Sequence, residues 1–76
     1  MFPRRSNAVA EKRVFDYVDT QTSLSETPVS LAHKLDVDVR TARRVLDHLF
    51  ERGQLHRREF GDIEPIYYRY PSLDGR

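Results

Sequence analysis

The sequence contains no cysteine and only three glycines among its 76 residues. Without cysteine the chain has no disulfide framework, no thiolate nucleophile and no thiolate metal site. Its longest apolar runs fall far short of the roughly 20 residues that a membrane-spanning helix needs. The first residues, MFPRRSN, lack the apolar region of a secretion signal. We therefore expect a cytoplasmic protein with no membrane segment.

Positive and negative charges nearly balance, so the chain is not a general polycation. Thirteen lysines and arginines stand against twelve acidic residues, which gives a net charge of +1. The positive excess is confined to residues 31–58, which hold seven basic and four acidic residues. This local surplus predicts one basic face on the folded protein. Its basic members are Lys34, Arg40, Arg43, Arg44, Arg52, Arg57 and Arg58.

The length allows one domain with a small core. A chain of this size buries only about 60% of the surface that its unfolded form exposes. We expect a single domain over 1–76, with an ordered core at about 7–71 and flexible ends at 1–6 and 72–76. A deep substrate cavity does not fit in such a domain. Ser30 and His33 lack a third catalytic group, and the three histidines share no metal-ligand spacing. We therefore expect no enzyme, no metal and no cofactor.

A first helix is predicted from the N-terminal region to about Asp19. Ser6 or Asn7 can cap its start. The polar stretch TQTSLSET that follows predicts a loop, from which Leu24 can pack on the core. One apolar stripe recurs at helical spacing and consists of Ala10, Val14, Tyr17 and Val18.

A second, short helix is predicted around Leu31, Ala32 and Leu35. Its start is open between two caps, namely Ser30, or Thr27 followed by proline at the first helical position. The segment DVD at 36–38 interrupts it.

The third helix, about 39–52, is the best-specified element. Asp38 can cap its first turn, and Val37 before the cap can contact Ala42. Gly53 can adopt the left-handed conformation that ends a helix. The inward face consists of Ala42, Val45, Leu46 and Leu49, and the other residues of interest, Arg40, Arg43, Arg44, Asp47 and Glu51, point elsewhere.

After Gly53 the apolar period changes to two, which predicts strands. The segments LHRRE and IYYRY flank FGDIEP, whose glycine and proline suit a turn of five or six residues. We expect a two-stranded hairpin over 54–70 with a mobile tip. Tyr68 and Tyr70 are expected in the core, which leaves Tyr67 as the only outward candidate for stacking on RNA bases. Shared faces are predicted for Leu55, Arg57 and Glu59, and for Ile66, Tyr68 and Tyr70.

The stretch PVSLAHKLDVDVRTARRVLDHLFERGQL, followed by YYRY, resembles the winged helix-turn-helix domain of prokaryotic transcription regulators. The similarity covers a small helix, a Leu-x-Val-polar turn, Thr41 in the first turn of the next helix, Leu-x-x-Leu, a closing glycine and a Tyr-Arg strand. It extends over about residues 9–71. It implies an α+β fold, mainly α, with three helices and a C-terminal two-stranded β-hairpin wing.

This resemblance implies sequence-specific binding of double-stranded DNA, with the helix at about 39–52 in the major groove and the wing 54–70 on the backbone. An arginine can bind guanine O6 and N7 together. Arg4 and Arg5 are candidates for a minor-groove arm. The implied base contacts are Val39, Arg40, Arg43 and Arg44; the implied phosphate contacts are Thr41 and Ser30; and the implied wing contacts are Arg57, Arg58 and Arg69.

Two departures from the family's pattern favour an alternative. Asp36 stands where glycine is usual, and Asp38 where serine is usual, so both place negative charge beside the helix that would meet phosphates. A protein-protein interaction module without DNA binding is therefore the alternative function. The first helix, the 20–28 loop and the ends are the segments that could form a homodimer, and monomer, weak dimer and DNA-assisted dimer all stay open.

Overall fold

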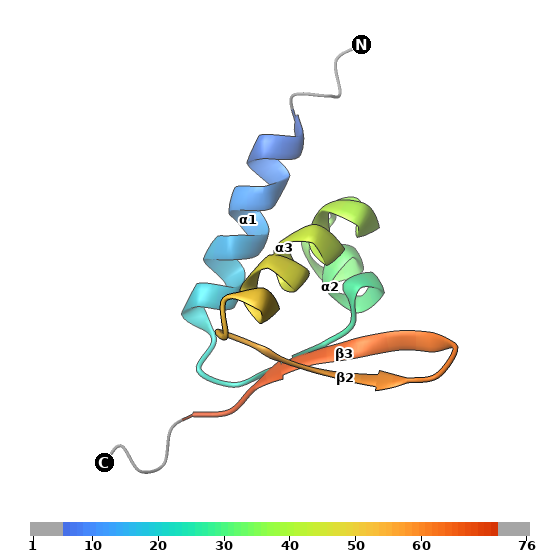
Figure 1. Ribbon diagram of the computed structural model, residues 1–76. Helices are drawn as coiled ribbons and strands as arrows, with labels where there is room; N and C mark the ends of the chain where they lie inside the picture. The colour runs from blue at the N-terminus through green and yellow to red at the C-terminus, as the bar shows by residue number, and fades with distance from the viewer. Residues whose placement is uncertain (1–5, 72–76) are drawn as a thin grey trace.

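The computed structural model describes residues 6–71, with side chains from residue 8. Its elements follow the chain as α1 (Ser6–Thr20), β1 (Leu24–Glu26), α2 (Pro28–Leu35), α3 (Val39–Glu51), β2 (His56–Phe60) and β3 (Ile63–Arg69) (Figure 1). The strands form one antiparallel sheet in the order β1-β3-β2. The predicted class, a small and mainly helical α+β fold, is confirmed at this level.

Both ends of the chain lie largely outside the described residues. This applies to the predicted flexible ends 1–6 and 72–76, except for Ser6, where α1 begins. It also applies to the arm residues Arg4 and Arg5 and to the side chains of the expected caps Ser6 and Asn7.

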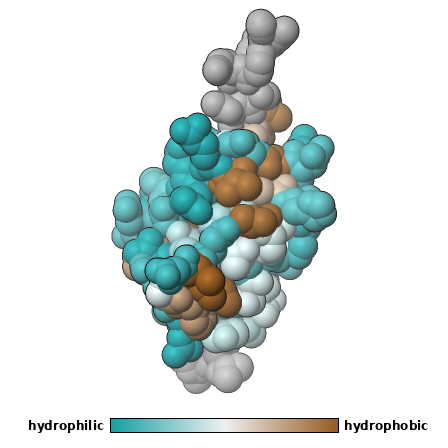
Figure 2. All heavy atoms as spheres, turned by 90° about the vertical axis from the view of Figure 1, so that its right-hand side faces the viewer, coloured by the Kyte–Doolittle hydropathy of each residue, from teal (hydrophilic) through white to brown (hydrophobic). Residues whose placement is uncertain are grey.

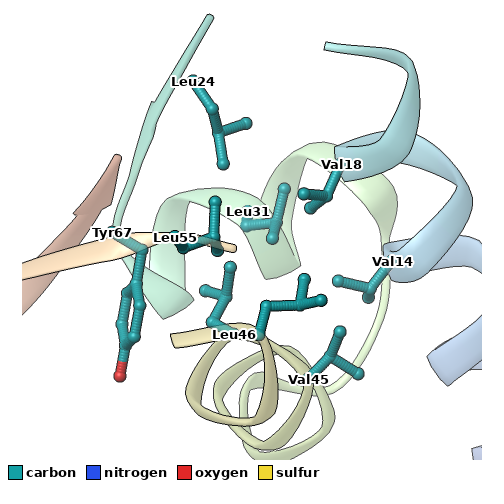
Figure 3. Packing of buried hydrophobic residues seen from close by; sticks show 9 residues of the cluster. Val14, Val18, Leu24, Leu31, Val45, Leu46, Leu55 and Tyr67 are labelled. Atoms are coloured by element: carbon teal, nitrogen blue, oxygen red, sulfur yellow. The ribbon is translucent and has the colours of Figure 1, made fainter. Parts of the chain in front are cut away.

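The core lies where the three helices meet the sheet, and every element except β2 contributes to it. The predicted stripe of α1 and the inward face of α3 are confirmed, since Val14, Val18, Val45 and Leu46 are almost completely buried. Figure 3 shows these side chains pointing toward one another, with Tyr67 closing one side. The buried cluster consists of Val14, Val18, Leu24, Leu31, Val45, Leu46, Leu49, Leu55 and Tyr67.

Helix α2 begins with a complete capping box. The Thr27 side chain accepts a hydrogen bond from the Ser30 backbone N–H, and the Ser30 side chain accepts one from the Thr27 N–H. Pro28 occupies the first turn, where its missing N–H costs nothing. Of the two predicted starts, Thr27 is therefore the cap, and Ser30 is its partner three residues later.

The turn between α2 and α3 holds Asp36 in the left-handed conformation, with φ of 58° and ψ of 50°. Val37 follows as a partly buried residue packed on the core. Asp38 then caps α3, as predicted, and its side chain accepts a hydrogen bond from the Arg40 backbone N–H at 3.1 Å. The turn thus fixes where α3 begins and which of its residues point outward.

Asp36→Gly is expected to stabilise the protein by about 1 kcal/mol, because glycine adopts the left-handed region without the steric cost that a Cβ brings. Asp36→Val is expected to destabilise it, because a branched side chain tolerates that conformation least. Urea denaturation of both variants measures the two changes. Equal stability of the glycine and valine variants would contradict this account of the turn.

Gly53 ends α3 as predicted. Its φ is +80°, its N–H donates to the Phe50 carbonyl, and the Gln54 N–H donates to the Leu49 carbonyl. This pair of bonds is the Schellman arrangement, which satisfies carbonyls at a helix end. The chain then turns directly into β2.

The strand β1 was not predicted. Leu24 to Glu26 pair with Arg69 to Tyr67, so the expected loop contains the third strand of the sheet. A segment of three residues with one apolar side chain is too short to show a period of two. The expected packing of Leu24 on the core is confirmed.

The hairpin is tighter than predicted. Its strands extend to Phe60 and Ile63 and leave only Gly61 and Asp62 as the turn, where Gly61 has φ of +71°. The prediction of a five- or six-residue loop is wrong because Pro65 lies inside β3 rather than in the turn. The register of β2 and β3 shifts by one residue opposite this proline, and such a bulge accommodates the N–H that proline lacks.

The faces of β3 are the reverse of the prediction. Tyr67 is 1% exposed and packs in the core, whereas Tyr70 is 68% exposed and Tyr68 is half-buried. The residues of β3 that point inward include Arg69. The prediction placed the face with more apolar residues inward, and it therefore assigned the charged Arg69 to the outside. This arginine has polar partners inside the fold, so the apolar pattern identified the wrong face.

Candidate nucleic-acid interface

The first half of α3 presents Val39, Arg40 and Arg43 to solvent. These residues lie on the side of the helix opposite its buried face, which the Asp38 cap and the core fix in place. Within residues 6–71, neither Arg40 nor Arg43 makes an ion pair. Their guanidinium groups can therefore meet an anionic ligand without first breaking a salt bridge of the described chain.

Arg44 points toward α1 instead. Its guanidinium lies 2.6 Å from a carboxylate oxygen of Glu11, although most of the side chain is exposed. A surface ion pair of this kind contributes at most about 1 kcal/mol. Arg44 is thus occupied as the structure stands, and the expected base contact would require the loss of this pair.

Arg57, predicted as a wing contact, is engaged inside the fold. Its guanidinium binds Asp47 at 3.0 Å and Glu59 at 3.3 Å, and it stacks over the Phe50 ring at 4.2 Å. The side chain connects β2 to α3. A contact with the DNA backbone would require Arg57 to leave these partners, so this placement gives the prediction no support. Period two placed Arg57 on the same face as Leu55 but could not identify its carboxylate partners.

Arg69, the other inward arginine, contacts the C-terminal end of α1. Its guanidinium donates hydrogen bonds to the carbonyl oxygens of Val18, in the last turn of α1, and of Gln21, which follows the helix. The predicted wing contact of Arg69 would likewise require the loss of these hydrogen bonds.

The two residues expected to contact phosphates differ in exposure. Thr41 is 2% exposed and belongs to the buried side of α3, a placement that does not support its predicted phosphate contact. Ser30 is exposed, but its hydroxyl donates to a Glu26 carboxylate oxygen at 2.6 Å and accepts from the Thr27 N–H. A phosphate at Ser30 would meet this carboxylate, so this arrangement does not favour the predicted contact.

Lys34 forms an ion pair with the same glutamate. Its ammonium lies 2.6 Å from Glu26 and 3.3 Å from the Tyr17 hydroxyl, and the Glu26 hydrogen bond raises the pKa of Lys34 above its ordinary value. Of the seven basic residues in 31–58, those without an ion pair inside the described chain are Arg40, Arg43, Arg52 and Arg58.

Arg58 lies on the sheet face that points away from the helices. It pairs with Ile66, whereas its neighbour Arg57 pairs with the buried Tyr67 on the inward face. The side chain is exposed, as a wing contact requires. It faces away from α3, however, and therefore does not extend the surface formed by Arg40 and Arg43.

A polar network under the hairpin was missed by sequence reasoning. Asp47 accepts hydrogen bonds from the Tyr67 hydroxyl and from Arg57, so that one carboxylate joins α3 to β2 and β3. Burial raises the pKa of Tyr67, and its hydrogen bond to Asp47 adds to the effect. Helix spacing had indicated Asp47 only as an outward residue.

Ionisation of Tyr67 is expected to lower the free energy of unfolding at alkaline pH. Its pKa in the folded state is raised, so its contribution is complete below about pH 10, the value of an unfolded tyrosine, and is lost as the pH rises toward the folded value. We expect the free energy of unfolding of the wild type to fall more steeply above pH 10 than that of Tyr67→Phe. Parallel urea denaturation at several pH values tests this, and identical slopes would contradict it.

Figure 2 shows the side toward which the hairpin tip and the start of α3 point. Apolar residues form separate groups among hydrophilic ones there, rather than one continuous patch. Large contiguous apolar patches mark interfaces with apolar partners. This face therefore shows no single large patch of that kind.

Within residues 6–71, no three His, Asp or Glu side chains are grouped so that they could hold a metal ion. In the same part of the chain, no helix has the length and apolar character needed to cross a membrane. Comparisons with protein-family models, curated proteins and solved structures find no match for this chain.

Proposed function

We propose that the chain is a winged helix-turn-helix domain that binds double-stranded DNA and regulates transcription. The observation that carries the proposal is the exposure of Arg40 and Arg43 on the first half of α3, without ion pairs inside the described chain. The succession of α2, a short capped turn, α3 and a hairpin supports it. In this proposal the domain is not an enzyme, needs no cofactor and acts at the nucleoid in the cytoplasm.

The recognition element is the first half of α3. The major groove, about 12 Å wide, admits one helix with its side chains. Arg40 and Arg43 each have the donors to bind a guanine edge or a phosphate, and Val39 is the apolar residue placed to contact a thymine methyl group. Asp38 accepts a hydrogen bond from the Arg40 backbone N–H, and the partial positive charge of the helix start offsets part of its negative charge.

The contact with phosphates is small. Arg57 and Arg69 are engaged within the fold, Arg58 faces away from α3, and the hairpin turn carries Gly61 and Asp62. The described residues therefore offer two free arginines to a duplex. One such helix distinguishes few base pairs, so useful specificity requires two copies on one site. Sedimentation with and without duplex tests whether the copies associate.

The proposal predicts a weak dependence of duplex affinity on salt. Each bound domain brings two free guanidinium charges to the duplex, which gives a slope of about −2 per domain in a plot of log K against log salt concentration. Affinity is thus expected to fall about tenfold between about 50 mM and 200 mM salt. Fluorescence anisotropy with duplexes enriched from a random-sequence pool measures the slope. If no duplex binds even at the lower salt concentration, the proposal fails.

A protein-protein interaction module is the second candidate. Asp36 and Asp38 are both exposed beside Arg40, and Arg44 and Arg57 are already paired with carboxylates, so the start of α3 carries mixed charge. A protein surface of mixed charge suits such a patch better than a duplex does. Absence of duplex binding in low salt, with the protein folded, favours this candidate.

A further inference from the structure

The outward face of the sheet carries aromatic rings and one arginine. Pairing places Ser25, Tyr68 and His56 in one row across the three strands, and Ile66 and Arg58 in the next row. Tyr70, which directly follows β3, lines the same hollow as Tyr68 and therefore lies on the same side. None of these six outward residues carries a carboxylate.

The rings form a continuous series. The centroids of His56 and Tyr68 are 5.2 Å apart with planes at 31°, and those of Tyr68 and Tyr70 are 5.4 Å apart with planes at 46°. Tyr70 ends the series and is 68% exposed. Its ring is thus a large, rigid surface with one neighbour and an open side.

Arg58 lies beside these rings and is not occupied. A shallow hollow of about 300 Å³ is lined by Ser25, Arg58, Phe60, Ile66, Tyr68 and Tyr70. Within residues 6–71, Arg58 makes no ion pair, whereas the adjacent Arg57 has two. The hollow thus combines aromatic side walls with one cation that has no carboxylate on its own face.

We propose that this outer sheet face binds single-stranded nucleic acid, with unpaired bases stacked on Tyr70 and Tyr68 and a phosphate held by Arg58. Aromatic side chains stack on the faces of bases, and a neighbouring cation follows the backbone. Paired bases in a duplex are already stacked and present only their edges, so this face requires an unpaired strand. The site is separate from Arg40 and Arg43 and does not depend on the duplex proposal.

Charge disfavours the other occupants of this face. A second copy packed sheet to sheet would bring two Arg58 side chains onto one small surface that offers no carboxylate to pair them. An apolar protein surface would bury the guanidinium without a counter-charge, which is costly. A strand with bases and phosphates matches both the rings and the cation.

The test uses labelled single strands of oligo-dT and oligo-U, with a duplex of equal length, in anisotropy titrations at low salt. Tyr70→Ala is expected to weaken single-strand binding about tenfold, the effect of one lost base stack. Tyr70→Phe keeps the ring and should bind like the wild type. Arg58→Ala should weaken binding and reduce the salt slope by about one. Binding of either strand supports the site, and a preference between them distinguishes RNA from DNA.

Arg52→Ala is the matched control for charge, because Arg52 is also exposed and lies near Phe15 and Asp16, outside the hollow. It should leave single-strand affinity within about twofold of the wild type. The proposal is overturned if neither strand binds at low salt, or if Arg52→Ala weakens binding as much as Arg58→Ala. Self-association that depends on Tyr70, without strand binding, would also overturn it.

Discussion

Duplex DNA affinity is expected to fall about 100-fold when Arg40 and Arg43 are both replaced by alanine. Each arginine that binds a base edge in bidentate fashion contributes roughly 1–3 kcal/mol, and about 1.4 kcal/mol corresponds to a factor of ten. Anisotropy titrations at a fixed salt concentration measure the loss. Both side chains are exposed, so the free energy of unfolding should change by no more than about 0.5 kcal/mol, which separates lost binding from lost folding.

Arg44→Ala is the matched control on the same helix. It makes the same chemical change, but the guanidinium that it removes is held by Glu11. Its effect on duplex affinity should be several times smaller than that of Arg40→Ala or of Arg43→Ala. Arg43→Lys keeps the charge and removes the planar pair of donors, so it should retain salt dependence but lose base preference. If the double variant binds within twofold of the wild type, α3 is not the DNA contact.

Asp47→Ala is expected to lower the free energy of unfolding by about 2 kcal/mol. The substitution leaves the Tyr67 hydroxyl buried without its acceptor, and an unsatisfied buried donor costs about 1–3 kcal/mol. The higher helix propensity of alanine offsets a few tenths of a kcal/mol of this loss. Urea denaturation followed by circular dichroism measures the change.

Asp47→Asn provides the control, because an amide oxygen can still accept from the Tyr67 hydroxyl while the charge beside Arg57 is gone. Its cost should lie between those of the wild type and the alanine variant. Glu51→Ala, an exposed acidic residue one turn further along α3, should change stability little. Equal stability of Asp47→Ala and Glu51→Ala would contradict the role given to the network.

The helices could be predicted from the sequence because two independent signals coincide in each. In α3, apolar residues repeat at the helical period, Asp38 caps one end and Gly53 closes the other. Both signals are local and depend on backbone geometry that neighbouring residues determine. The inward faces of α1 and α3 followed from the same period.

The sheet could be predicted only in part, because its pairing depends on residues far apart in the chain. β1 is too short to show a pattern, and it exists because β3 offers it a partner more than 40 positions away. The faces of β3 were reversed because Arg69 occupies an inward position, where carbonyls at the end of α1 receive it.

The candidate site could also be predicted only in part, because contacts between distant residues decide which arginines are free. The sequence identifies which residues are arginines and places Arg40 and Arg43 on the outside of a helix. It does not show which other arginines find partners within the fold, because Glu11 and Arg44 are brought together only by the packing of α1 on α3. Arg44, Arg57 and Arg69 each have at least one partner that comes from a different helix or from the segment after it.

The central claim is that the first half of α3 contacts DNA. Its most direct test follows the backbone amide signals of the ¹⁵N-labelled protein by NMR during titration with a duplex that binds. The amides from Val39 to Arg44 should shift most, those at the hairpin tip less, and those of the outer sheet face around Tyr70 least. Shifts concentrated on α1 or on the outer sheet face, with the start of α3 unchanged, would show that α3 does not contact DNA.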